Sequence, residues 1–296
     1  MTTKSETVFL FPIVFLLLLS SCKKTGVGEE MAYFDRLIDN TYKQKDYNRL
    51  VMLTDSLLMT GDISDAKACF WQGCAYDRLK QKDKANEYWT LAMKHAEESD
   101  NTVDGEYYEK SASRLANLLC LERDFQGVLK MAMPAVKYLE EHKRDTTSDY
   151  INLLIYIGLS QVSTGANEED TENAFFIACQ KHKENISRTH TDEAYKDAIA
   201  GLINIAFYCI QAEKYKAALY YTGSFGELLG EYQQRPDVDE TYIDKQIGRY
   251  TIYKAQALQK LGRTKDAADT YKVFLDTKFS QTSEGLALAQ NYQPER

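Results

Sequence analysis

The most constraining feature of this sequence is a pattern of small and aromatic residues shared by two predicted helices, residues 66–80 and 84–96. Gly73 and Ala85 fall where the two helices would cross, and Trp89 falls beside that crossing. Since residues three or four apart share one face of a helix, small residues there let two backbones approach while the aromatic ring fills the space around them. A chain with this pattern is expected to fold as an antiparallel helix pair.

The spacing of the pattern resembles that of a known repeat. It reads G-x2-Y from Gly73 to Tyr76, then, after eight residues, A-x3-W-x2-A from Ala85 through Trp89 to Ala92. This resembles the tetratricopeptide repeat (TPR), a helix-turn-helix unit that stacks into solenoids because one pair cannot bury its apolar face alone. The resemblance implies a scaffold, and it does not specify a ligand.

Weaker copies of the pattern cover most of the chain. We therefore predict an all-α, TPR-like right-handed superhelical solenoid over residues 31–296, with about six helix pairs plus a C-terminal helix. Few prolines and glycines, 4 and 15 in 296 residues, agree with an all-helical chain. Besides the pair above, the predicted helices are Met31–Lys43 with Tyr47–Met59, Gly105–Leu121 with Phe125–Glu141, Ser148–Thr164 with Asp170–Lys183, Asp192–Ala212 with Tyr215–Tyr232, Asp239–Leu261 with Lys265–Thr277, and Ser283–Tyr292.

Several departures from the regular repeat predict an irregular solenoid. After the second pair, corresponding residues are further apart than the period of about 34 residues that TPR units show. Pro134 is expected to kink or end its helix, because proline removes a backbone hydrogen bond. The register of the fourth pair stays open. The last helix lacks a partner, so it is either a cap or the first part of a longer repeat array.

The N-terminus carries the signature of an exported lipoprotein. The apolar run Val8–Leu19 is shorter than the roughly 20 residues needed to span a membrane, and it has the length of a signal-peptide core. Leu19-Ser20-Ser21-Cys22 resembles a bacterial lipobox, which implies lipidation of Cys22. We predict a signal peptide over residues 1–21 and a lipidated linker over residues 22–30. A plain signal peptide with a coincidental cysteine is the alternative.

Lipidation would determine where the protein resides. Several acyl chains on Cys22 would suffice for stable membrane attachment, and Lys23 and Lys24 would lie at the lipid headgroups. We therefore expect a lipid-anchored protein of a Gram-negative cell envelope. Because no aspartate directly follows Cys22, we expect the outer membrane, with the folded part facing the periplasm.

Composition and motifs argue against several classes of function. The net charge of −8 and the lack of a basic stripe argue against a nucleic-acid partner. No phosphate-binding loop, dinucleotide fingerprint, metalloprotease motif or nucleophile elbow is present, so we predict no enzyme, no cofactor and no metal. The cysteines beyond Cys22 lie in predicted helices as small buried hydrophobes, and the four histidines are expected on the solvated surface.

The TPR resemblance also implies where a partner would bind. In TPR proteins the first helix of each pair lines the inner, concave surface, which takes extended peptides or a partner helix. Ser113 stands where a lysine would complete a carboxylate clamp with Asn117, so that clamp is not predicted. The alternative for each predicted residue is contact with the next repeat or with water. The predicted partner-binding residues are Lys67, Phe70, Asp77, Arg78, Lys110, Asn117, Asn152, Phe207, Arg249 and Gln256.

Three functions agree with these features. The leading hypothesis is a non-enzymatic, membrane-anchored scaffold that binds a protein or peptide partner at the cell envelope. The chain is also similar to the extracytoplasmic repeat regions of TPR-containing sensor histidine kinases, in which case signalling would require residues beyond Arg296. A lipoprotein that captures glycans or other nutrients is the third hypothesis, although little sequence lies outside the predicted helices.

Overall fold

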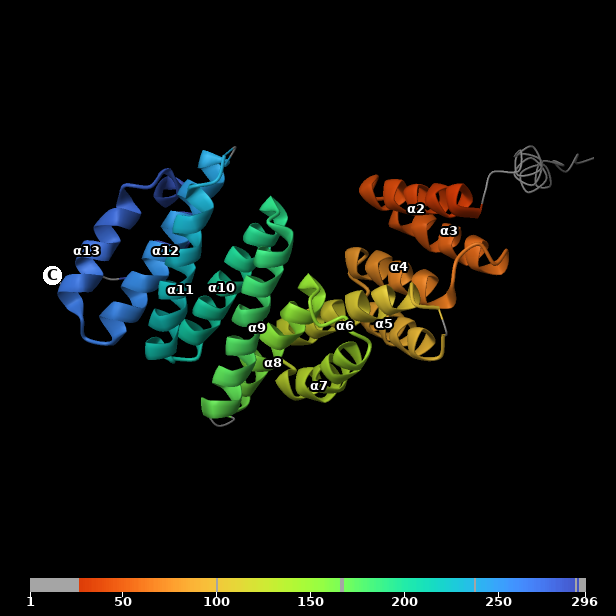
Figure 1. Cartoon of the computed structure of the whole chain (residues 1–296), viewed down its shortest axis with the longest axis horizontal. Helices are drawn as coiled ribbons and strands as arrows, with labels where there is room; N and C mark the ends of the chain where they lie inside the picture. The colour runs from red at the N-terminus through yellow and green to blue at the C-terminus, as the bar shows by residue number, and fades with distance from the viewer. Residues whose placement is uncertain (1–26, 100, 166–167, 237, 291, 293–296) are drawn as a thin grey trace, which may run out of the picture. The chain divides into compact units, whose positions relative to one another are not determined.

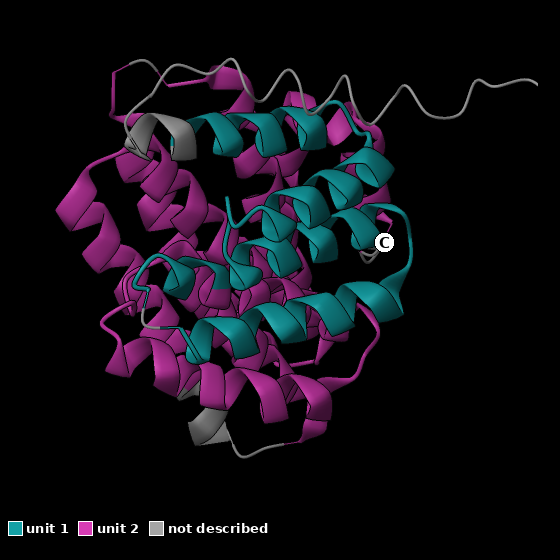
Figure 2. Cartoon of the chain, turned by 90° about the vertical axis from the view of Figure 1, so that its right-hand side faces the viewer, with its two compact units in different colours: residues 1–107 teal, residues 108–296 magenta. Residues whose placement is uncertain are grey.

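The chain divides into two compact units, residues 1–107 and 108–296 (Figure 2). Throughout the described residues the regular elements are helices. The structure is a computed structural model that describes residues 27–99, 101–165, 168–236, 238–290 and 292.

The first unit contains two antiparallel helix pairs (Figure 1). Helix α2 (Val27–Lys43) pairs with α3 (Tyr47–Met59), and α4 (Asp65–Arg78) pairs with α5 (Lys82–Glu97). Helix α3 also packs against α4, so the two pairs are joined. Polar caps begin the helices: the side chain of Ser64, for example, accepts a hydrogen bond from a backbone N–H in the first turn of α4.

Four further pairs and a short final helix follow in the sequence, and all of them except the first residues of α6 belong to the second unit. In the order of the chain, the first helices of these pairs are α6, α8, α10 and α12, and the second helices are α7, α9, α11 and α13. Successive first helices α8, α10, α12 and α14 pack against one another. The bounds are α6 (Asp104–Leu121), α7 (Phe125–Glu141), α8 (Ser148–Thr164), α9 (Glu168–Thr189), α10 (Asp192–Gln211), α11 (Tyr215–Gln233), α12 (Glu240–Lys260), α13 (Thr264–Leu275), the 3-10 helix η1 (Lys278–Gln281) and α14 (Ser283–Ala289).

Contacts between a glycine and an aromatic ring hold the helix pairs together. A Cβ atom placed on Gly73 would lie 2.5 Å from the indole of Trp89, which is only 2% exposed. In the fourth pair, a Cβ on Gly158 would lie 2.6 Å from the ring of Phe175. Glycine is required at both positions because any side chain would collide with the ring. The contact of Gly158 with Phe175 also establishes the register of the fourth pair.

The turn between the helices of a pair has a recurrent geometry. Lys80, Arg123, Glu213 and Gly262 each follow a first helix and have φ between 59° and 74°. The next residue then donates its N–H to a carbonyl five positions earlier, as Asp124 does to Leu119 at 2.9 Å. This left-handed C-cap satisfies carbonyls at the helix end and reverses the chain within a few residues. It is the local reason why successive helices are antiparallel.

The expected all-α, TPR-like solenoid of about six helix pairs plus a C-terminal helix is confirmed over the described residues. Two helix bounds differ clearly from the sequence prediction. Helix α9 extends to Thr189 because its apolar face continues at the buried Ile186. Helix α2 begins at Val27, inside the predicted linker. Helix α7 has the predicted bounds, and it contains Pro134 without ending there. The predicted signal peptide and Cys22 lie outside the described residues.

Candidate functional site

In the first unit, two of the predicted partner-binding residues hold neighbouring first helices together. Lys67 is 8% exposed, and its ammonium group forms an ion pair with Asp35 of α2. The guanidinium Nε of Arg78 donates a hydrogen bond of 2.9 Å to the hydroxyl of Tyr42, also on α2. These contacts between α4 and α2 agree with the alternative in which such residues serve repeat packing.

The other two predicted residues of this unit differ from each other. Phe70 is buried, with its ring centroid 5.3 Å from that of Trp71 and 5.7 Å from that of Tyr107. It therefore belongs to the aromatic core of the unit. Asp77 is half-buried near the end of α4.

At the C-terminal end of the second unit, predicted residues bind the final helix. Arg249 of α12 donates through Nε to a carboxylate oxygen of Glu284 at 2.9 Å. Gln256, also on α12, donates through Nε2 to the backbone carbonyl of Leu288 at 3.0 Å. Both side chains therefore attach α14 to α12. Phe207 is half-buried and packs against Tyr253, with ring centroids 5.8 Å apart.

The remaining predicted residues lie together on α6 and α8. Lys110, Asn117 and Asn152 are all half-buried. The hydroxyl of Tyr156 on α8 donates a hydrogen bond of 3.1 Å to the side-chain oxygen of Asn117 on α6. These three residues belong to a polar surface that continues onto α10.

Residues three, four or seven positions apart, and therefore on one face of each helix, make up this surface on three successive first helices. The carboxylate of Asp197 on α10 accepts a hydrogen bond of 2.5 Å from Ser148 on α8. Two of its exposed members, Arg114 and Asn204, were not predicted from the sequence. We call it the first-helix surface and define it by Lys110, Arg114 and Asn117 of α6, Asp149, Asn152 and Tyr156 of α8, and Asp197, Asn204 and Tyr208 of α10.

Burial and charge perturb the ionisable groups of the first-helix surface. Burial raises the pKa of Asp149, against the opposing effects of a hydrogen bond from Ser113 and of the positive charges of Arg114 and Lys110. Burial also raises the pKa of Tyr156, with a further contribution from Tyr208. The surface therefore presents cationic, amide and phenolic groups close together, around a carboxyl group that is partly removed from water.

The second helices contain a residue that the sequence analysis placed wrongly. His182 was expected on the solvated surface, but it is 4% exposed. It packs against α10, where a Cβ on Gly201 would lie 2.4 Å from its Nε2 atom. Neither ring nitrogen has a hydrogen-bond partner within the described structure. Burial lowers its pKa to about 4, so the imidazole is neutral.

The buried His182 predicts a pH dependence of stability. An unfolded histidine has a pKa of about 6.5, so between about pH 6.5 and about pH 4 the unfolded chain binds a proton that the folded chain does not. Acidification across this range should therefore lower the free energy of unfolding by about 3 kcal/mol. Denaturant titrations of the wild type and His182→Leu at several pH values test this, because the carboxyl groups are common to both. Equal pH dependence in the two proteins would contradict the prediction.

The properties of the described residues bear on three features: reactive thiols, metal sites and membrane-spanning helices. Burial raises the pKa of the Cys69 and Cys120 thiols to about 11, which disfavours the reactive thiolate. Within the described ranges, no group of three or more histidine, cysteine, aspartate or glutamate residues is placed to hold a metal ion. In the same residues, no helix combines the length and the apolar character needed to cross a membrane.

Comparison with known proteins places the chain by fold. No protein-family model matches it, and no curated protein matches it. Among solved structures, BtubC (BKLC) from P. vanneervenii is similar, with a TM-score of 0.53 and 12% identity over 92% of this chain and 96% of that one. The apo form of RapI has a TM-score of 0.51 and 10% identity, over 89% of this chain and 100% of its own.

A third similar structure is Nro1, described as a nuclear import adaptor that regulates sterol synthesis in hypoxia. Its TM-score is 0.51 with 11% identity, over 90% of this chain and 94% of that one. Because these identities are low, the likeness concerns the arrangement of the helices. What each of these proteins binds does not carry over to this chain.

Proposed function

We propose that this chain is a non-enzymatic scaffold that binds an extended peptide segment of a partner protein on its first-helix surface. We further propose that it does so at the cell envelope of a Gram-negative bacterium, anchored through a lipid on Cys22. The first part rests on the described structure. The second rests on the N-terminal sequence.

The observation that carries the binding proposal is a difference between two groups of polar residues on the first helices. Lys67, Arg78, Arg249 and Gln256 are engaged in contacts between neighbouring helices. By contrast, the described structure gives Arg114, Asn152 and Asn204 on the first-helix surface neither a hydrogen bond nor an ion pair. Polar side chains that are held on rigid helices without partners are suited to bind a ligand.

The chemistry of this surface suits an extended peptide. Each asparagine offers a donor and an acceptor on one side chain, which matches the N–H and C=O groups that an extended backbone leaves unpaired. Arg114 offers a planar fork of donors to a carboxylate on the peptide. Because both asparagines and this arginine lie on successive helices, an extended chain that crosses α6, α8 and α10 could contact them in turn.

Site-directed photocrosslinking in intact cells tests the binding proposal. A photoreactive residue at Asn152 should crosslink a partner protein, whereas the same residue at Met133, which is exposed on the second helix α7, should not. In an Arg114→Ala, Asn204→Ala background the crosslink at position 152 should fall several-fold, because the two substitutions remove paired polar contacts. Lys130→Ala, an exposed substitution on α7, is the control for altered surface charge. Equal labelling from positions 133 and 152 would contradict the proposal.

The anchoring proposal rests on the sequence Leu19-Ser20-Ser21-Cys22 that ends the apolar run. Lipidation of Cys22 would attach the protein stably to the membrane, because a stable anchor needs two or more acyl chains. This attachment would keep the helical units close to the membrane. We propose the outer membrane, facing the periplasm, as the location. A partner would then be held near the inner surface of that membrane.

Replacement of Cys22 with alanine should abolish the attachment of lipid to the protein. We expect the wild type in the membrane fraction and Cys22→Ala in the soluble periplasmic fraction or retained with an uncleaved signal peptide. Fractionation combined with metabolic labelling by a fatty-acid analogue measures both outcomes. Cys120→Ala controls for the loss of a thiol as such. A Cys22→Ala variant that stays lipid-labelled would contradict the anchoring proposal.

A further inference from the structure

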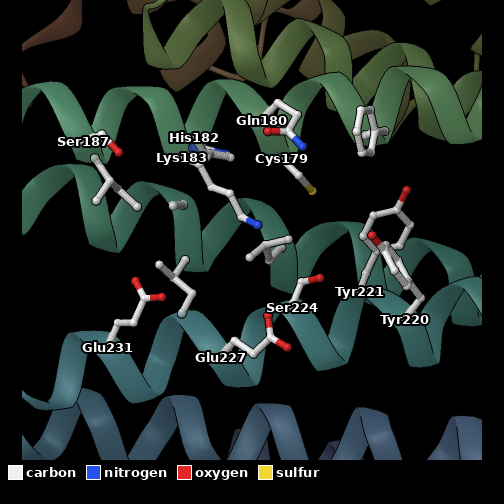
Figure 3. Close-up of a pocket in the computed structure, with 15 residues that line it drawn as sticks. Cys179, Gln180, His182, Lys183, Ser187, Tyr220, Tyr221, Ser224, Glu227 and Glu231 are labelled. Carbon is white, nitrogen blue, oxygen red and sulfur yellow. The ribbon is translucent and has the colours of Figure 1, made fainter.

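A pocket lies between the second helices α9 and α11 of the second unit, with α10 behind it (Figure 3). Its volume is about 290 Å³, close to the lower limit of about 300 Å³ for small-molecule sites in proteins. None of its lining residues belongs to the first-helix surface. A function of this pocket is therefore separate from the peptide binding proposed above.

The lining of the pocket is apolar in its depth and aromatic at one end. Buried Leu202 and Leu228 form part of the floor. At one end stands Tyr220, which is 62% exposed, beside the buried Tyr221 (Figure 3). Phe176, which is 48% exposed, also lines the pocket. Large aromatic side chains that remain this exposed around a pocket offer surface to an apolar group of a ligand.

The centre of the pocket carries charges of both signs. Lys183 extends from α9 toward α11, where Glu227 and Glu231 lie one helical turn apart on the facing side (Figure 3). In the described structure none of these three side chains takes part in an ion pair, although the nearby Lys181 is bound to Asp145 and Glu184. The pocket thus holds one cation and two anions that are available to a ligand.

The buried His182 also lines the pocket, but it offers no polar atom to a ligand. Both of its ring nitrogens are covered by protein atoms, and Nε2 faces Gly201 of α10. Because burial also keeps the ring neutral, His182 contributes an uncharged part of the lining.

We propose that this pocket binds a small zwitterion with an apolar substituent, of the amino-acid class. The carboxylate of the ligand pairs with Lys183, its ammonium group lies at Glu227 and Glu231, and its apolar substituent packs against Phe176 and Tyr220. A ligand with one charge would satisfy only part of this arrangement: an amine would meet the positive charge of Lys183, and a carboxylate would meet the two glutamates.

Other chemistry at the pocket is disfavoured by its residues. Cys179 also lines it, but burial raises the pKa of this thiol to about 12, so a thiolate nucleophile is not formed at neutral pH. The glutamates and Lys183 of the pocket therefore act as binding groups. Binding of a ligand, without its conversion, is the function that these groups support.

Titration calorimetry on the full chain in mild detergent tests the proposal with three probes that share one phenylethyl body. These are phenylalanine, 2-phenylethylamine and 3-phenylpropanoate, which carry both charges, the cation alone and the anion alone. We expect phenylalanine to bind about 10-fold or more tightly than either other probe, since each charged contact contributes about that factor. Hydrogen exchange should slow in α9 and α11 on binding and remain unchanged in α13.

Substitutions at exposed positions separate the two charged contacts. Lys183→Met should remove the preference for phenylalanine over 2-phenylethylamine, and Glu227→Gln with Glu231→Gln should remove the preference over 3-phenylpropanoate. Lys216→Met, an exposed lysine on α11 outside the pocket, should leave both preferences unchanged. Phenylalanine that fails to bind, or that binds no better than both single-charge probes, would overturn the proposal. So would preferences that survive the pocket substitutions.

Discussion

Replacement of Trp89 with alanine should lower the free energy of unfolding of the first unit by about 3–5 kcal/mol. The indole is 2% exposed and lies against Gly73, so its removal leaves a space that neither helix can fill from its own side chains. Helices α4 and α5 cannot move together to close it, because the short turn at Lys80 holds their relative position. The substitution therefore removes both buried apolar surface and packing contacts.

Tryptophan fluorescence measures this change within one unit. The chain contains 2 tryptophans, Trp71 and Trp89, and both belong to residues 1–107. In Trp89→Ala the remaining Trp71, which packs against the core of the unit, reports its denaturant-induced unfolding. Glu87→Ala on the exposed face of α5 is the control, with an expected change below about 0.5 kcal/mol.

Trp89→Phe adds a finer test of the same contact. The indole N–H of Trp89 has no hydrogen-bond partner in the described structure. Phenylalanine keeps most of the apolar volume and removes this unsatisfied donor, so it should cost less than half as much as alanine. If alanine at position 89 cost no more than Glu87→Ala does, the close contact of α4 with α5 would not be the main support of this unit.

Replacement of Phe175 with alanine should lower the free energy of unfolding of the second unit by a similar amount, about 3–5 kcal/mol. Phe175 is 1% exposed and lies between Gly158 on α8 and Tyr221 on α11, whose ring centroid is 5.7 Å away. It therefore joins α9 to both the helix before it and the second helix of the next pair. Calorimetry or circular dichroism of thermal unfolding measures the change.

The neighbouring aromatic residue provides the matched control for Phe175. Phe176 is 48% exposed, so Phe176→Ala should cost less than about 1 kcal/mol. Gly158→Ala alone should cost about 1–3 kcal/mol, because its methyl group would meet the ring of Phe175. Gly158→Ala combined with Phe175→Ala should cost less than the sum, since the methyl group enters the vacated space. Additive costs would show that the two residues do not act as one contact.

The candidate site was predicted in part, for a reason that particular residues make clear. Lys110, Asn117 and Asn152 are predicted because the TPR resemblance places them on first helices, and they belong to the first-helix surface. The same reasoning also selected Lys67 and Arg249, whose ion pairs with Asp35 and Glu284 attach neighbouring helices. Sequence position alone could not separate these cases, because the partner of each side chain lies more than 30 residues away.

Two exposed residues of that surface, Arg114 and Asn204, could have been predicted from helical periodicity. Each lies three or four positions from a predicted residue of the same helix, Lys110 or Phe207. The pocket could not have been found in this way. Its charged and aromatic groups come from α9 and α11, and the close approach of His182 to Gly201 depends on how α10 packs against α9.

The sequence by itself determined the helix pairs, their approximate bounds and the glycine that faces an aromatic ring in the second pair. These features depend on the spacing of residues within about 35 positions, which a periodic pattern records directly. Tertiary structure alone decided which polar side chains are used in packing, and it alone buried His182. Both outcomes depend on contacts between different helix pairs, whose distances and angles are set by the packing of many side chains at once.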